Sequence, residues 1–198
     1  MKFKPYYKLL LVLLSITALS CTSKVAKEVS SESTIKRDVA QTDSDYNPEA
    51  KLGNLGIELS TPSSPIANYV NAVRVGNLIF LSGKGPLKPD GKNITGKVGE
   101  DLTIEEGYEA ARITGINQLS VLKAELGNLN KVKRIVKVKG MVNCTPDFAD
   151  QPKVVNGYSD LMVAVFGERG KHARAAVGMG SLPGNIAIEV DMVVEVSD

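Results

Sequence analysis

Apolar side chains recur at helical spacing between Thr103 and Gly127. Thr103 is followed three residues later by Glu106, which is the pattern of a capping box at a helix start. Gly127 stands where a left-handed residue commonly ends a helix. The pattern therefore predicts one long helix with a single apolar stripe, formed by Ile104, Tyr108, Ala111, Gly115, Leu119, Leu122 and Leu126.

Other segments alternate between apolar and polar residues, which is the period of a β-strand. The clearest alternation runs from Val132 to Asn143. A second, less regular helix is predicted from Pro152 to Phe166, and Asn47-Pro48 is a suitable start for a short helix through Leu55. The remaining strands are predicted at residues 69–75, 78–82, 173–179 and 186–196.

Leaving aside the short first helix, the predicted order of elements is β-β-α-β-α-β-β. Two helices and a mixed sheet indicate a two-layer α+β sandwich with the helices on one face of the sheet. The other sheet face would then be uncovered, and in a domain this small an uncovered face favours oligomerisation.

The last two predicted strands are separated by the turn residues 181–184 and are expected to pair as a hairpin. If their apolar positions share one face, Arg174 lies on the face away from the helices, directly across from Asp191 and diagonal to Glu189. The pattern has two interpretations. It is either a surface ion pair, worth ~0–1 kcal/mol, or a guanidinium and carboxylates that bind a ligand together.

The first twenty residues have the layout of an export signal. Three lysines precede an apolar run at residues 9–19, which is followed by Ser20-Cys21. The run is shorter than the ~18–20 residues that span a bilayer. It resembles a bacterial lipoprotein signal, so we expect a signal peptide at 1–20, an acylated Cys21, a polar tether at 21–46 and one domain at 47–198, held at the cell envelope by the lipid alone. In the alternative, the leader is secretory and Cys21 is incidental.

Composition excludes several function classes. The net charge is +2, and removing the three leader lysines leaves −1 for the rest of the chain, so no broad nucleic-acid surface is expected. The basic residues between 131 and 139 fit an exposed strand face. With one histidine, His172, and one thiol besides Cys21, at Cys144, the chain cannot assemble a Cys/His zinc site, and we expect no metal and no cofactor. His172 fits either a solvent-facing loop residue or a second acid–base group.

Two motifs at opposite ends of the domain resemble the RidA (YjgF-like) family of reactive-intermediate deaminases. One runs through residues 66–83, including the Ser82-Gly83 pair, and the other through residues 173–191. The resemblance covers Pro65 to Val196. It implies the chorismate-mutase-like fold, a homotrimer, and ligand sites between subunits.

The resemblance also implies roles for five residues. Arg174 would clamp the carboxylate of a small substrate, and Glu189 would activate the water that attacks an enamine or imine carbon, giving a 2-oxo acid and ammonia. Tyr69, from a neighbouring subunit, would close the pocket. Gly83 would let the backbone approach the ligand, and Asn156 matches a family asparagine.

The chain also departs from the family pattern. His172 stands where the family has proline, and Lys84-Gly85-Pro86 follows the Ser-Gly pair where the family has Gln-Ile/Val-Pro. These departures indicate a divergent subfamily. They leave open a second function, in which the same cleft binds a small carboxylate without catalysis, and a third, in which the protein is purely structural.

Overall fold

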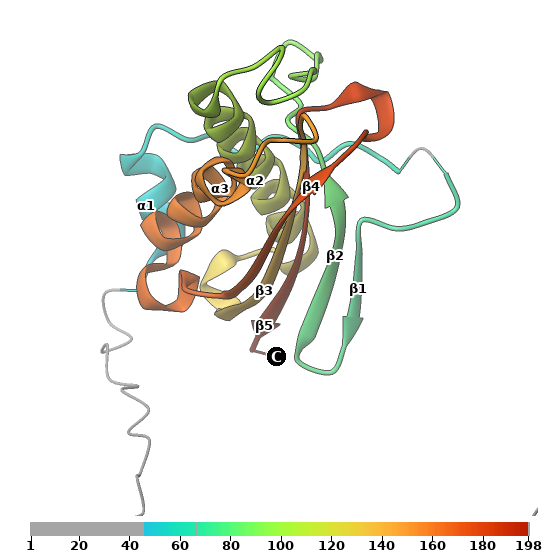
Figure 1. Ribbon diagram of the computed structural model, residues 1–198. Helices are drawn as coiled ribbons and strands as arrows, with labels where there is room; N and C mark the ends of the chain where they lie inside the picture. The colour runs from blue at the N-terminus through green and yellow to red at the C-terminus, as the bar shows by residue number, and fades with distance from the viewer. Residues whose placement is uncertain (1–45, 66, 198) are drawn as a thin grey trace, which may run out of the picture. The chain divides into compact units, whose positions relative to one another are not determined.

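The computed structural model describes residues 46–65 and 67–197 (Figure 1). The expected signal peptide, Cys21 and almost all of the tether lie outside the described residues. Within the described part no helix is long and apolar enough to cross a membrane. Its α-helices are α1 (Pro48–Asn54), α2 (Ile104–Leu126) and α3 (Gln151–Phe166), and its strands are β1 (Ala72–Val75), β2 (Leu78–Lys84), β3 (Val132–Asn143), β4 (Ala173–Met179) and β5 (Ile188–Val196).

The strands form one mixed five-stranded sheet in the order β1-β2-β5-β3-β4. β3 and β4 run parallel, and the other neighbouring strands are antiparallel. The helices lie on one side of this sheet (Figure 1). The predicted α+β sandwich and the predicted element order are therefore confirmed.

The predicted hairpin between the last two strands is wrong. β5 lies between β2 and β3, whereas β4 pairs with the other side of β3. The backbone N–H of Cys144 donates to the carbonyl of Met179 and that of Asn143 donates to the carbonyl of Ala187, so the β4–β5 connection passes over the end of β3. A parallel β3–β4 pair needs a long crossover connection, which α3 supplies.

This topology changes the face on which Arg174 lies. Arg174 pairs with Val138 of β3, which is fully buried beneath the helices. Laterally paired residues share a sheet face, so Arg174 lies on the helix side. Glu189 alternates with the buried Ile188 and Val190 and therefore lies on the opposite side.

The ends of α2 follow the local signals of the sequence. The N–H of Glu106 donates to Oγ1 of Thr103 at 3.2 Å, and the N–H of Thr103 donates to Oε2 of Glu106 at 2.8 Å, which completes the capping box. Gly127 ends the helix with a φ of 72°.

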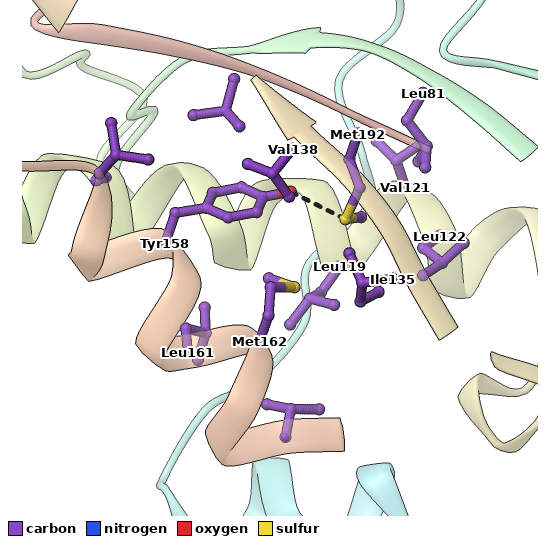
Figure 2. Close-up of a cluster of buried hydrophobic side chains, with 14 of the residues drawn as sticks. Leu81, Leu119, Val121, Leu122, Ile135, Val138, Tyr158, Leu161, Met162 and Met192 are labelled. Atoms are coloured by element: carbon purple, nitrogen blue, oxygen red, sulfur yellow. Dashed lines mark hydrogen bonds between the residues drawn. The ribbon is translucent and has the colours of Figure 1, made fainter. Parts of the chain in front are cut away.

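Two glycines bring α3 close to its neighbours. A Cβ atom at Gly157 would lie 2.0 Å from the carbonyl oxygen of Tyr108 on α2, and one at Gly140 would lie 2.6 Å from Val155. The core between α3 and the sheet includes Tyr158, which is fully buried and donates its hydroxyl to Sδ of Met192 at 3.2 Å (Figure 2). These contacts fix the position of α3 and therefore of its polar residues near Gly157.

The sheet face away from the helices carries exposed apolar side chains on β1 and β2. Val73, Val75 and Phe80 are 52%, 60% and 45% exposed. Val73 pairs with Phe80, and Phe80 pairs with Val193 of β5, so the patch runs across three strands.

Candidate functional site

Arg174 forms a polar cluster with α3. Its Nη1 donates to Oδ1 of Asn156 at 2.9 Å and to Oγ of Ser159 at 3.0 Å. Asn156 and Ser159 are three residues apart on the helix and therefore lie on the same side of it. Because Gly157 holds α3 tightly against α2, both acceptors are offered to Arg174 from a fixed position.

The charge of Arg174 is not neutralised within the described part of the chain. Its two hydrogen-bond acceptors there are an uncharged amide and an uncharged hydroxyl, and no carboxylate lies within ion-pair distance. A half-buried guanidinium with unused donors suits a planar anion such as a carboxylate. The predicted ion pair with Asp191 or Glu189 is wrong, and so is the prediction that Arg174 shares a sheet face with these carboxylates within one chain.

His172 continues the cluster on the same edge of the fold. Its Nε2 lies 3.0 Å from Oγ of Ser159 and its Nδ1 lies 2.6 Å from the carbonyl oxygen of Gly170. The pKa of His172 is lowered, chiefly by burial and also by the positive charge of Arg174, while the Gly170 hydrogen bond acts in the opposite direction. This half-buried, bonded ring does not fit a solvent-facing loop histidine.

Glu189 and Gly83 form a second contact on the opposite side of the sheet. Gly83 lies where the β2–β5 register shifts between Leu81 and Lys84. A Cβ atom at residue 83 would lie 2.0 Å from Oε1 of Glu189. The glycine predicted to admit a ligand therefore makes room for the Glu189 carboxylate itself.

Tyr69 lies in the irregular segment before β1, which begins at Ala72 and not at residue 69 as predicted. Its side chain is 47% exposed. The five residues named from the sequence thus fall into three places: Arg174 with Asn156 on the helix side, Glu189 with Gly83 on the other side, and Tyr69 on a loop.

Sequence reasoning missed Ser159 as a member of the site and left His172 between two alternatives. Ser159 is three residues after Asn156 on a helix, and His172 is two residues before Arg174, so both spacings place them beside known candidates. The spacing is informative only once α3 is known to lie beside β4, and this contact between distant segments was not predicted.

A protein-family model described as "YjgF/chorismate mutase-like, putative endoribonuclease" matches residues 49–196. The chain belongs to the YjgF family. Protein TCP17 of Trypanosoma cruzi is 44% identical over 150 residues, which cover 75% of this chain and 94% of that protein. A RutC family protein of Pyrococcus abyssi is 32% identical over 65% of this chain and 87% of its own length.

Solved structures of YjgF-like proteins show the same fold. A protein of unknown function from Agrobacterium tumefaciens is 41% identical with a TM-score of 0.71, over 76% of this chain and 92% of that one. A Shewanella oneidensis protein described as a "putative endoribonuclease" is 32% identical with a TM-score of 0.73, over 76% and 99%. These similarities establish the family and its fold.

Two basic residues of β3 face acidic partners in this YjgF domain. Lys139 pairs with Asp191, and Arg134 pairs with Glu195. Cross-strand neighbours of opposite charge reduce the local positive potential at these two positions.

Lys84 is the other departure from the RidA pattern. Burial lowers the pKa of its ammonium group, whose Nζ donates to Oδ1 of Asn71 at 2.6 Å. This bond ties the end of β2 to the segment before β1, so Lys84 holds the loop that carries Tyr69.

Proposed function

We propose that this protein hydrolyses reactive enamines or imines that carry a carboxylate, releasing a 2-oxo acid and ammonia. The main support is Arg174, a half-buried guanidinium whose position is fixed by two uncharged acceptors and whose charge has no carboxylate partner in the described chain. A substrate carboxylate would complete this cluster through the free donors of the guanidinium.

Within one chain Arg174 and Glu189 lie on opposite sides of the sheet, so a single copy does not present both to one ligand. We propose that copies assemble as a trimer, in which the Arg174 edge of one subunit meets the Glu189 face of the next. The exposed Val73, Val75 and Phe80 support this arrangement, because they lie on the same face as Glu189 and would be buried by a partner.

In this arrangement each group has a separate task. Arg174 binds the substrate carboxylate, and Asn156 orients Arg174. Glu189 accepts a proton from the attacking water as the water oxygen bonds to the imine carbon, and then passes this proton to the nitrogen. The C–N bond of the resulting carbinolamine breaks as its hydroxyl becomes the carbonyl and gives up its proton, so the nitrogen leaves as ammonia. Tyr69, exposed on its loop, covers the bound substrate from the neighbouring subunit.

The test is hydrolysis of an imine generated in situ from an amino acid by an oxidase, using the chain from Thr22 onward. Arg174→Ala should lower binding by at least about 30-fold, from the ~2 kcal/mol lost with a charged partner. Glu189→Gln should lower turnover by ~10²–10⁴-fold, the usual contribution of a positioned proton acceptor. No acceleration by the wild-type chain across a broad amino-acid panel would reject catalysis.

Mixing two inactive variants tests the shared site. Arg174→Ala and Glu189→Gln chains are refolded together in equal amounts. If Arg174 and Glu189 of one site come from different subunits, about one quarter of the subunit boundaries in the mixed trimers should carry both intact groups and regain activity. Mixtures that stay as inactive as the separate variants would place both groups in one subunit or exclude this assembly.

A second function is non-catalytic binding of a small carboxylate. The observation that favours it is the distance of Glu189 from the Arg174 cluster, since binding alone requires only the cluster. In that case Glu189→Gln would leave 2-oxo acid binding unchanged and Arg174→Ala would abolish it, with no hydrolysis by either protein.

We also propose that a lipid on Cys21 holds the protein at the cell envelope. The support is the lysine-rich, apolar leader that ends at Ser20-Cys21. Metabolic labelling with a fatty acid should mark the wild-type chain and not Cys21→Ser. Equal labelling of the two would overturn the proposal.

A further inference from the structure

The hydrogen bonds around Ser159 form a chain with a defined direction. A carbonyl oxygen only accepts, so Nδ1 of His172 must donate to Gly170. In the neutral ring Nε2 then accepts, and the Ser159 hydroxyl must donate to it. The oxygen of Ser159 is therefore left to accept from Nη1 of Arg174.

Both ends of this chain are held by backbone packing. A Cβ atom at Gly170 would lie 2.2 Å from the carbonyl oxygen of Met162, so the segment that anchors His172 is pressed against α3. At the other end Asn156 shares Nη1 of Arg174 with Ser159. The imidazole, the hydroxyl and the guanidinium therefore have little freedom to move independently.

We propose that Ser159 and His172 are positioning residues, which form a hydrogen-bond relay that orients Arg174 and couples its carboxylate ligand to the proton on His172. The proposal rests on the proposed function in one respect, namely that Arg174 binds a carboxylate. It adds two residues to that site and a dependence on pH.

Protonation of His172 changes the relay. Nε2 then carries a hydrogen and becomes a donor, so the Ser159 hydroxyl must turn its own hydrogen away from the ring. Two positive groups then share one serine oxygen. A carboxylate on Arg174 offsets their repulsion, so it favours the protonated ring, and the protonated ring favours the carboxylate by the same factor.

Within the described part of the chain, Arg174 is the charged group whose field lowers the pKa of His172. The other charged residues nearby have partners of their own or lie on another face. Glu168 pairs with Lys171 at 2.6 Å, and Asp160 accepts a hydrogen bond from Tyr108. Arg169 lies over the ring of Tyr46. The remaining neighbour, Lys137 on β3, pairs with Val193 and so lies on the opposite sheet face from the relay.

His172 is the single histidine of the chain, so its ring signals in NMR need no assignment by mutation. In the chain from Thr22 onward, we expect a neutral ring protonated at Nδ1 and a titration midpoint below the ordinary histidine value. Arg174→Gln should raise that midpoint, and Lys137→Gln, the matched loss of a nearby lysine charge, should leave it unchanged. A ring with mixed tautomers, or a midpoint that Arg174→Gln does not move, would overturn the relay.

The second measurement is pyruvate binding at a series of pH values. Affinity in the wild type should rise as the pH falls through the His172 midpoint, about tenfold for each pH unit by which pyruvate raises that midpoint. His172→Gln should show no such rise. Ser159→Ala should weaken binding about 2- to 10-fold at neutral pH, the range for one lost hydrogen bond, and Ser159→Thr should restore it.

A failure of the proposed function and a failure of the relay would give different results. If wild-type protein binds no pyruvate, the proposed function fails for this ligand, while the NMR titration still decides whether the relay exists. If pyruvate binds the wild type, and His172→Gln keeps the same pH profile, the coupling is wrong and the function stands.

Discussion

Replacing Gly83 by alanine tests whether Glu189 acts from the position in which the structure holds it. A Cβ atom at residue 83 would lie 2.0 Å from Oε1, 2.9 Å from Cδ and 3.0 Å from Cγ of Glu189. The added methyl group and the carboxylate cannot share this space, so the carboxylate must rotate away. The obstructed atoms belong to a flexible side chain, and Gly83 has no positive φ, so the backbone need not move.

The expected loss of stability and the expected loss of activity differ in size. Forcing one side chain off its preferred rotamer costs about 0.5–1.5 kcal/mol, and each kcal/mol lowers Tm by about 2–4 °C in a domain of this size. A positioned proton acceptor contributes about 10²–10⁴-fold to the rate. Gly83→Ala should therefore lose little stability and most of the activity that depends on Glu189.

The assay compares imine hydrolysis and thermal unfolding for four proteins: the wild type, Gly83→Ala, Glu189→Gln and the double variant. Both changes remove the proton transfer by the Glu189 carboxylate. The double variant should therefore be no slower than the slower single variant. Gly53→Ala is the control, since nothing lies within 4 Å of a Cβ atom there. A wild-type rate for Gly83→Ala would show that Glu189 does not act from this position, and so would a double variant whose loss of rate equals the product of the two single losses.

Three further predictions concern stability. Gly157→Ala should cost about 1–3 kcal/mol or more in denaturant unfolding, because its Cβ would meet the backbone oxygen of Tyr108 at 2.0 Å; Gly53→Ala, in open space within α1, should instead be neutral or stabilise by up to about 1 kcal/mol. Thr103→Ala should cost about 1 kcal/mol by removing the N-cap of α2, and an unchanged Tm would contradict the capping box. Burial raises the pKa of Tyr46 to about 12. The stability that this raised pKa contributes is complete below pH ~10, where unfolded tyrosine titrates, and is lost as the pH rises toward 12. Tyr46→Phe should flatten the loss of stability in that alkaline range.

The parts of the fold that depend on local signals were predictable from the sequence. The cap at Thr103 and the stop at Gly127 set the bounds of α2, and both depend on residues within one helical turn. The bounds of β3 and β4 also agree with the predicted strands. Asn156 lies beside Arg174 and Gly83 beside Glu189, pairings that the family motifs did not specify.

The pairing of the last strands was not predictable in the same way. β4 consists largely of alanine, valine and glycine, so its two faces differ little in polarity and do not indicate which neighbour it prefers. Proximity in the sequence favoured a hairpin with β5. The structure pairs β4 with β3 because the α3 crossover packs on the sheet, and this contact depends on Gly140 rather than on any strand signal.

The placement of Arg174 and Glu189 on opposite surfaces of one sheet has a consequence for when the protein can work. If catalysis uses the proposed shared site, a lone chain carries two half-sites and no complete one, so a newly made or diluted molecule is chemically inert. Encounter with further copies would then be the event that starts turnover, and the local abundance of the chain would set a threshold for its activity.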